Sequence, residues 1–362
     1  MVLMRIVLDN FFIFTNFELT SSYPKKIIGS TIEEEWLPDR PNFRYKKLIV
    51  VMGTNASGKT TLGKALMGIF HFIGRKGYSL LTEMISNPEN VASFTMDFIP
   101  TSVEPILYRV STKIFPPKND SYTSDCFEVT VTSVPIGKND NYEMCKARLD
   151  SLDKEPMPIE TAFDQIPPFG WNFTYPESKR ALKKPDDKEF LHVLQNVLGT
   201  LDPSIVSVER SKEADDAYVI CLHDRSLVLQ EETIKTEDIL SSGTKTGLSI
   251  ALLLASIMTH ENGFYYCDET FSYVHSEIEQ EILSKMIEKL GPYEQLFFTT
   301  HNRDLLDMSL PNHSFLFLKK EEQEITPTYA DAYLKRNTDS LRKAVENDLF
   351  AIAPDVRGIS AL

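Results

Sequence analysis

The stretch that decides the fold is Gly53-Thr54-Asn55-Ala56-Ser57-Gly58-Lys59-Thr60, which fits the phosphate-binding pattern G-x-x-x-x-G-K-[ST] at every fixed position. Residues 47–52, directly before it, form a short apolar run rich in β-branched residues, which predicts a buried parallel strand. After it, apolar residues recur at helical spacing, so a helix is predicted to begin near Thr60. A chance match in a glycine-bearing turn is the alternative, but the flanking strand and helix favour nucleotide binding.

Each fixed residue of this loop has a chemical reason to bind a polyphosphate. Glycines at both ends let the loop wrap closely, so that backbone N–H groups and the positive end of the helix dipole converge on the phosphates. Lys59 has the reach for the β- and γ-phosphates, and the Thr60 hydroxyl can ligate Mg²⁺. We therefore expect Gly53 through Thr61 to bind ATP, with Mg²⁺ as its cofactor.

Length and composition exclude several classes of protein. A chain of 362 residues with 42% hydrophobic composition can bury a large core. No apolar run approaches the ~20 residues that cross a bilayer, and no secretory signal opens the chain, so we expect a cytoplasmic protein without a membrane partner. The four cysteines are scattered without a C-x-x-C pair, which favours buried reduced thiols over a zinc site or a disulfide framework.

The charge balance disfavours non-specific electrostatic binding of nucleic acid. Lysine and arginine number 38 against 52 acids, which gives a net charge of -14. Two basic clusters remain candidates for a local groove: Lys179-Arg180 with Lys183-Lys184, and Lys335-Arg336 with Arg342-Lys343. Solvated faces explain such short clusters more often than binding sites do.

The remaining pattern predicts a mixed α/β chain. Residues 5–19 are predicted as short strands, and residues 20–46 as a surface excursion. Strands near 94–98, 107–110 and 127–131 predict an antiparallel sheet, and the proline-rich residues 135–188 predict an irregular or partly helical insertion. A helix over 189–201 and strands over 217–221 and 226–230 follow. We divide the chain into 1–92, 93–200 and 201–362, the first and last being two parts of one nucleotide-binding head.

A second anion site is predicted where Ser241, Ser242 and Gly243 precede a buried helix over residues 248–258. Small hydroxylated residues and glycine at a helix N-terminus bind anions for the same reasons as the first loop. The alternative is an ordinary helix N-terminus without a ligand, because Ser-Ser-Gly is also a common sequence there. Next, an apolar strand over 263–267 ends in Asp268 and Glu269. At the carboxyl end of a central strand, Asp268 can hold Mg²⁺ and Glu269 can act as general base, whereas the alternative is a strand that enters an acidic loop.

A histidine ends the last predicted buried strand. Residues 276–279 predict a capping box for a helix, and residues 295–300 then predict a strand with His301 at its end. A lone histidine is usually structural, but one that follows the strand after the acidic pair can donate a hydrogen bond to a γ-phosphate.

The order of these motifs resembles that in the nucleotide-binding heads of ABC-type ATPases. The resemblance implies that residues 240–244 are the signature motif, 266–269 Walker B, the region around His275 the D-loop, and His301 the switch histidine. It also implies the fold class: an α/β head with a mixed central sheet, an antiparallel β subdomain, a helical signature lobe and no long coiled coil. The residue sequences of the first loop and of Thr299-Thr300-His301-Asn302 look most like those of the RecF/SMC/OLD branch. Residues 336–354 look like the C-terminal segment of abortive-infection ATPases in that branch. Residues 81–200 match no part of it.

Three departures from the family pattern matter. Ser242 stands where many relatives have glycine, and no glutamine before Gln165 can be the residue that usually senses Mg²⁺. OLD nucleases carry a C-terminal Toprim domain, whose spaced acids are lacking in residues 302–362. The chain therefore resembles an ATPase whose effector is a separate protein, similar to two-gene phage-defence systems such as PARIS.

The function implied is an ATP-hydrolysing switch that pairs as a homodimer or higher homo-oligomer and controls a separate nuclease or toxin, with a phage protein or DNA as trigger. A DNA repair or recombination ATPase of RecF/SMC type that binds DNA directly is the alternative. A transporter ATPase would need a membrane partner. A nuclease is the weakest reading, because Glu177-Ser178-Lys179 lacks an aspartate on a preceding strand.

Overall fold

The chain folds into two compact units. The first comprises Met1–Trp171, Gly263–Tyr266 and Pro292–Leu362, and the second Asn172–Asn262 and Cys267–Gly291. The computed structural model describes residues 1–100, 105–117, 119, 121–153, 155–175, 187–212, 217–223, 225–230, 233–234, 242–322, 324–335 and 339–353.

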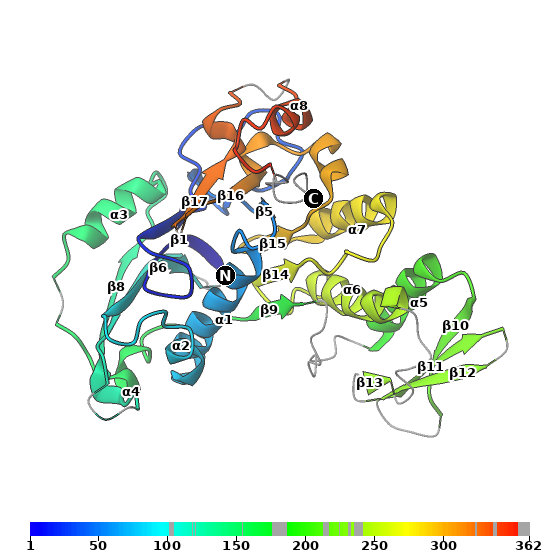
Figure 1. Cartoon of the computed structure of the whole chain (residues 1–362), viewed down its shortest axis with the longest axis horizontal. Coiled ribbons are helices and arrows are strands. Elements are labelled where there is room, and N and C mark those ends of the chain that lie inside the picture. The colour runs from blue at the N-terminus through cyan, green and yellow to red at the C-terminus, as the bar shows by residue number, and fades with distance from the viewer. Residues whose placement is uncertain are drawn as a thin grey trace, which may run out of the picture. The chain divides into compact units, whose positions relative to one another are not determined.

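Three buried parallel strands form the centre of the first unit (Figure 1). They are β5 (Leu48–Met52), β15 (Gln295–Thr299) and β16 (Phe315–Glu321). β5 lies between the other two and pairs in parallel with both. The strands predicted before the phosphate-binding loop and before His301 are thus confirmed. Because all three strands run in the same direction, their carboxyl ends meet at one edge of the sheet.

Further strands make this sheet mixed, in the order β17-β16-β5-β15-β14-β9. β17 (Glu324–Tyr329) runs antiparallel to β16, while β14 (Phe264–Asp268) and β9 (Trp171–Thr174) each begin in the first unit and end in the second. Residues 135–188 were predicted as irregular or partly helical: helices over 142–150 and 159–162 agree with that prediction, whereas β9 is a strand that it missed. The backbone at Gly170, just before β9, accepts hydrogen bonds from the N–H groups of Gly263 and Phe264, a pairing that no local pattern could indicate.

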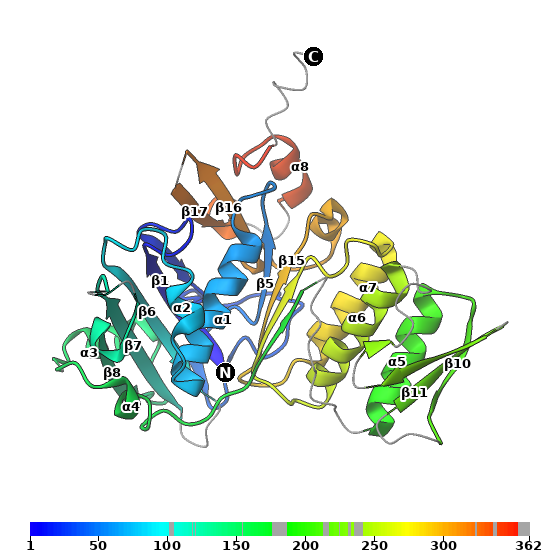
Figure 2. The ribbon, with the colours of Figure 1, turned by 60° about the horizontal axis from the view of Figure 1, so that its bottom comes forward.

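The helix predicted to begin near Thr60 is confirmed as α1 (Lys59–Arg75), which runs alongside β5 in Figure 2. Its buried face contains the predicted apolar series Leu62, Leu66, Ile69 and Ile73. The short α2 (Ser79–Thr82) follows it. Burial of this stripe holds the first turn of α1 against the sheet, which fixes the loop that precedes it.

The predicted antiparallel sheet is confirmed, with the strand order β2-β1-β6-β7-β8. Its strands are β1 (Val2–Asp9), β2 (Phe17–Thr20), β6 (Ala92–Ile99), β7 (Ile106–Ile114) and β8 (Phe127–Pro135). The short η1 (Ser124–Cys126) precedes β8, and α4 (Ile159–Ala162) follows later.

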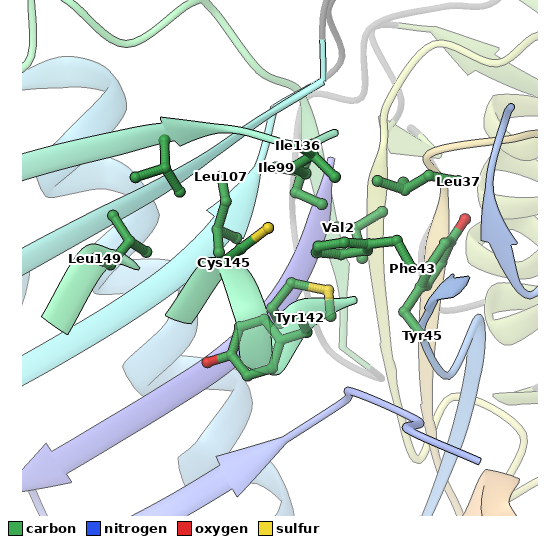
Figure 3. Packing of buried hydrophobic residues seen from close by; sticks show 12 residues of the cluster. Val2, Leu37, Phe43, Tyr45, Ile99, Leu107, Ile136, Tyr142, Cys145 and Leu149 are labelled. Atoms are coloured by element: carbon green, nitrogen blue, oxygen red, sulfur yellow. The ribbon is translucent and has the colours of Figure 1, made fainter. Parts of the chain in front are cut away.

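Helix α3 (Tyr142–Asp150) packs against this sheet through Tyr142, Cys145 and Leu149, which lie three and four residues apart (Figure 3). Residues of the hairpin β3 (Trp36–Leu37) and β4 (Arg40–Arg44) join the same core. The prediction of a surface excursion over 20–46 is therefore wrong in part. Prolines and charges mark the exposed turns of this stretch, whereas Leu37, Phe43 and Tyr45 are fully buried.

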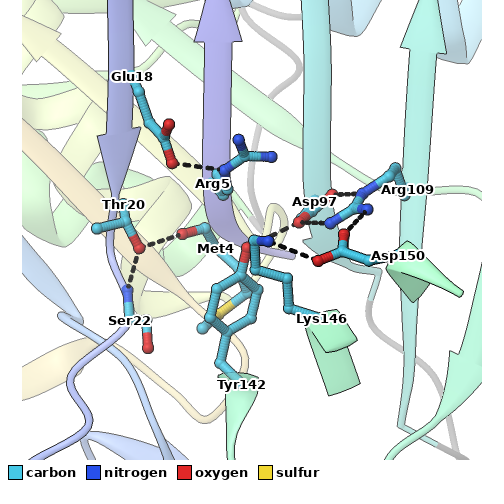
Figure 4. Close-up of polar contacts among 10 residues, drawn as sticks. All are labelled: Met4, Arg5, Glu18, Thr20, Ser22, Asp97, Arg109, Tyr142, Lys146 and Asp150. Atoms are coloured by element: carbon cyan, nitrogen blue, oxygen red, sulfur yellow. Dashed lines mark hydrogen bonds and ion pairs between the residues drawn. The ribbon is translucent and has the colours of Figure 1, made fainter. Parts of the chain in front are cut away.

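A buried ion pair joins two strands of the antiparallel sheet to α3 (Figure 4). The guanidinium of Arg109 donates to both carboxylate oxygens of Asp97, at 2.6 and 2.7 Å, and also to Asp150 at 2.5 Å. The Tyr142 hydroxyl donates to Asp97 at 2.7 Å. Since Asp97 is completely buried, these hydrogen bonds compensate the loss of its hydration.

The second unit contains helices and a small antiparallel sheet. Helix α5 (Asp187–Leu201) packs on α6 (Ser242–Met258), where a side chain at Gly247 would meet Leu198 and Leu201 at 2.8–2.9 Å. The sheet has the order β10-β11-β12-β13, with bounds Ile205–Arg210, Ala217–Leu222, Ser226–Gln230 and Thr233–Ile234. The predicted helices and the strands β11 and β12 are confirmed, while β10 and β13 were not predicted.

Helix α7 (Ser276–Lys289) corrects the predicted capping box. The helix already includes Ser276, and His275 occupies the N-cap position without a side-chain hydrogen bond to the helix. A serine inside the first turn cannot cap that turn in the manner of the predicted motif.

Short helical turns complete the first unit after β15. They are η3 (Arg303–Asp307), η4 (Asn312–Ser314), η5 (Ala330–Ala332) and α8 (Leu341–Glu346). The longest helices of the described chain, α1 and α6, have 17 residues each, so this part contains no long coiled coil. None of the described helices combines the length and apolar character needed to span a membrane.

Candidate functional site

The phosphate-binding loop adopts a backbone that its two fixed glycines permit. Gly58 has φ +97°, in the left-handed region, and a side chain there would meet Ile13 at 3.2 Å. A Cβ at Gly53 would lie 2.5 Å from the Ser57 hydroxyl and 2.6 Å from a backbone carbonyl of β16. Larger residues would therefore push the loop away from its supports.

Lys59 folds back over this loop. Its side chain is nearly buried, and its ammonium donates to the carbonyls of Gly53 and Thr54, both at 3.2 Å. The backbone carbonyl of Lys59 accepts a hydrogen bond from the Tyr266 hydroxyl at 2.7 Å. These contacts anchor the first turn of α1 to β14 and keep a cation against the inner side of the loop.

The residues present fit a bound polyphosphate. The Ser57 hydroxyl is buried within the loop and has no hydrogen-bond partner in the described chain. Glycines at both ends, an enclosed ammonium and an unsatisfied hydroxyl are what an anion cradle requires. Thr60 and Thr61 lie half-buried in the first turn of α1, where a threonine hydroxyl can ligate a metal ion.

One pocket joins the loop to the predicted histidine. It has a volume of about 650 Å³ and lies at the carboxyl edge of β5, β15 and β16. Gly53, Thr54 and Asn55 line it, together with Thr300 and His301. The structure thus brings together two segments about 250 residues apart in sequence, at the edge where parallel α/β sheets bind ligands.

The turn after β15 orients His301. The Asn302 N–H donates to the Thr300 hydroxyl at 2.9 Å, and the Asn302 side chain accepts from the N–H of Asp304 at 2.9 Å, which caps η3. His301 is exposed and lines the pocket. Asn302 was not predicted as a site residue, although asparagine before a helical turn is a common cap.

The two predicted acids lie in the second unit, at the end of β14. Asp268 is buried, and Glu269 is half-buried with φ +44°, a left-handed conformation that is unfavourable for a residue with a side chain. The Ser272 N–H and hydroxyl both donate to the carbonyl of Glu269, at 3.2 and 2.7 Å. Backbone strain of this kind concentrates at functional sites. Burial raises the pKa of the neighbouring Cys267 to about 12, so this thiol stays protonated at neutral pH.

Only part of the predicted signature motif lies within the described residues. Ser241 lies outside the described residues, as do Lys179 to Lys184, Arg336 and the Glu177-Ser178-Lys179 sequence. α6 begins at Ser242 with Gly243 in its first turn, as predicted for a helix N-terminus. In the described ranges no group of three or more histidine, cysteine or acidic residues forms a metal cluster.

Comparison with known proteins identifies the fold. No family model and no curated protein matches the sequence. Among solved structures, the chain is similar to an SMC head bound to the C-winged helix domain of ScpA, with 13% identity, 92% of this chain and 100% of that one covered, and a TM-score of 0.53. The fold is that of an SMC head.

The chain is also similar to a second SMC head, which has an extended coiled coil and is bound to the C-terminal domain of ScpA derived from Pyrococcus furiosus. The TM-score is 0.51 at 12% identity, and the match covers 96% of this chain and 99% of that one. The recombination mediator protein RecF covers 90% of this chain and 98% of its own at 11% identity, but its TM-score of 0.44 is too low to establish a shared fold. The predicted fold class, an α/β head with a mixed central sheet and an antiparallel β subdomain, is confirmed by the fold of the two SMC heads.

Proposed function

We propose that this chain binds ATP with Mg²⁺ and hydrolyses it to ADP and phosphate. The observation that supports it most is the pocket in which the loop residues Gly53, Thr54 and Asn55 face His301. The loop from Gly53 to Thr61 binds the phosphates through its N–H groups and the N-terminus of α1. The SMC-head fold agrees with this proposal.

Lys59 changes partners in this proposal. Its ammonium leaves the carbonyls of Gly53 and Thr54, which it contacts at 3.2 Å, for the phosphate oxygens of the nucleotide. A charge-assisted hydrogen bond to phosphate is stronger than one to a neutral carbonyl, so the exchange favours binding. Tyr266 keeps the backbone of Lys59 in place while the side chain moves.

The other predicted site residues have three separate roles in this proposal: metal binding, general-base catalysis and hydrogen bonding to the γ-phosphate. Thr60 and Asp268 hold Mg²⁺, which when bound neutralises charge on the phosphate oxygens. Glu269 takes a proton from the attacking water as general base, and its strained backbone supports a functional role. His301 donates a hydrogen bond to the γ-phosphate from the carboxyl end of β15.

Two copies of the chain pair head-to-tail in this proposal. Ser242 and Gly243, in the first turn of α6 of one protomer, contact the γ-phosphate held by Lys59 and Thr60 of the other, together with Ser241, which precedes them in the sequence. ATP then stabilises the closed pair, and hydrolysis loosens it, because the two states differ in their affinity for the nucleotide.

The pair acts as a switch on a separate protein. We propose a nuclease or toxin as that effector and an anti-phage defence role, triggered by a phage protein or DNA. The support is the resemblance of residues 336–354 to abortive-infection ATPases and the acidic charge of -14, which disfavours direct DNA binding. Both similar SMC heads are bound to a domain of a separate protein, ScpA, which supports a partner protein for this chain as well.

Nucleotide binding and light scattering test the proposal. Lys59→Ala should lose ATP binding, whereas Lys64→Ala, an exposed lysine on the same helix, should bind as the parent does. Glu269→Gln should retain ATP and accumulate as a dimer, while the parent dimer decays as phosphate is released. Hydrolysis by Glu269→Gln at the parent rate would exclude the assigned base, and DNA binding that weakens steeply with salt would favour the repair function instead.

A further inference from the structure

The pocket at the phosphate-binding loop has two cationic side chains that the ATP-binding motifs do not include. Arg303 is the first residue of η3, two positions after His301, and Lys320 lies near the carboxyl end of β16. Both line the pocket and both are exposed. Neither forms an ion pair with any described residue. One acid, Glu322, also lines the pocket but forms no ion pair with either of these two side chains.

Arg303 lacks a partner because its neighbouring acids are engaged elsewhere. Arg342 of α8 donates to Asp304 at 2.8 Å and to Asp307 at 2.6 Å. These are the two acids on η3 itself, so Arg342 neutralises the charges that would otherwise attract Arg303. The guanidinium of Arg303 remains available to a ligand in the pocket.

Lys320 faces the pocket because side chains alternate along β16. The residues on either side of it, Lys319 and Glu321, form an ion pair with each other. Lys320 therefore points to the opposite face of the strand, next to β5 and the loop that follows it. Lys320 and Arg303 therefore share one pocket with His301.

A third segment braces the elements that carry these cations. Phe350 stacks on Phe317 of β16, with ring centroids 4.0 Å apart and planes 18° apart, while Arg342 of the same segment holds η3. The N–H of Ala353 donates to the Asp348 carboxylate at 2.8 Å, which closes the turn that lines the pocket. Residues 341–353 therefore tie β16 to η3 and restrict the separation of Lys320 and Arg303.

We propose that Arg303 and Lys320 form an anion subsite for the terminal phosphate of a nucleoside triphosphate, so that the pocket binds triphosphates in preference to diphosphates. The inference deepens the proposed function and rests on it. The loop and the two cations line one continuous pocket, so a triphosphate that starts in the loop can extend its last phosphate toward them. A diphosphate ends within the loop and does not use the subsite.

Equilibrium binding of two nucleotides with Mg²⁺ tests this subsite: ADP, and the non-hydrolysable triphosphate AMP-PNP. Removal of a charge-assisted hydrogen bond weakens binding by roughly tenfold. Arg303→Ala and Lys320→Ala should each weaken AMP-PNP by about that factor and change ADP binding by less than about twofold. Lys319→Ala is the matched control, because it removes the adjacent lysine whose partner is Glu321, and it should bind both nucleotides as the parent does.

The outcomes separate the subsite from the proposed function. Equal weakening of ADP and AMP-PNP, or no weakening of either, would overturn the subsite while leaving ATP binding intact. A parent that binds neither nucleotide would overturn both. Arg303→Lys guards against a folding defect: partial recovery of AMP-PNP affinity with the parent melting temperature supports a direct charge contact, and no recovery of AMP-PNP affinity at that melting temperature contradicts it. Weaker association of the two heads with unchanged AMP-PNP affinity would assign the cations to a protein partner and exclude the subsite.

Discussion

Substitution of Gly63 by alanine tests whether α1 is held against β14 by a rigid contact. The added Cβ would lie 2.6 Å from one ring carbon of Tyr266 and 2.9 Å from another. That ring is fully buried, stacks on Phe297 at 5.8 Å, and is fixed at its other end by the hydrogen bond from its hydroxyl to Lys59. It therefore has no direction in which to move.

The expected magnitude follows from two opposing effects. Alanine in a helix interior is favoured over glycine by about 1 kcal/mol, and overpacking of a rigid core costs about 1–3 kcal/mol. Gly63→Ala should therefore lower the free energy of unfolding by about 1 kcal/mol. Gly68→Ala, on the same helix, is the control: the new methyl meets the end of the flexible Met84 side chain, so stability should be unchanged or rise slightly.

Urea unfolding followed by tryptophan fluorescence measures the difference. The two tryptophans of the chain, Trp36 and Trp171, both belong to the first unit, as do both substituted glycines, so the signal reports the relevant transition. Gly63→Ala should unfold at a lower urea concentration than Gly68→Ala, with similar slopes. Equal or greater stability of Gly63→Ala would refute a rigid contact between α1 and β14.

Two further substitutions test buried charges. Burial lowers the pKa of Lys46 from 10.5 to about 8, so the unfolded chain binds more protons than the folded chain between these pH values. The free energy of unfolding of the parent should therefore increase as pH rises from 8 to 10. Lys46→Met should lose this increase and should be more stable than the parent at pH 7, by up to about 3 kcal/mol in urea unfolding. Asp97→Asn should lower the free energy of unfolding by about 3 kcal/mol, because it leaves the guanidinium of Arg109 without its buried carboxylate. Glu18→Gln, which removes the acid of a surface ion pair, should lower it by less than about 1 kcal/mol. Equal melting temperatures for these two variants would contradict the burial of Asp97.

Local sequence patterns predicted most of the elements that surround the site. The apolar runs before Gly53 and before His301 have the length and composition of strands buried on both faces, and the structure contains both. The stripe that begins at Leu62 predicted α1. Such patterns are reliable because the period of a helix or strand acts over a few residues, within the reach of a sequence motif.

The failures have a different origin. β9 has only four residues, and its strand conformation depends on partners about 90 residues later in the chain. The buried aromatic residues between 37 and 45 lie in a stretch whose prolines and charges resemble a surface loop. His275 occupies the N-cap of α7, although the sequence predicts a capping box that begins at Ser276. For β9 and for the buried residues between 37 and 45, a tertiary contact outweighed the local pattern.

The sequence by itself determined the chemistry of the first loop, because two glycines, a lysine and a threonine at fixed spacing shape a phosphate cradle within eight residues. Only the tertiary structure decided that His301, Arg303 and Lys320 share a pocket with that loop. Their segments are separated by up to about 270 residues and meet because β15 and β16 flank β5 in parallel. Strand order depends on how whole faces pack, and no spacing along the chain encodes it.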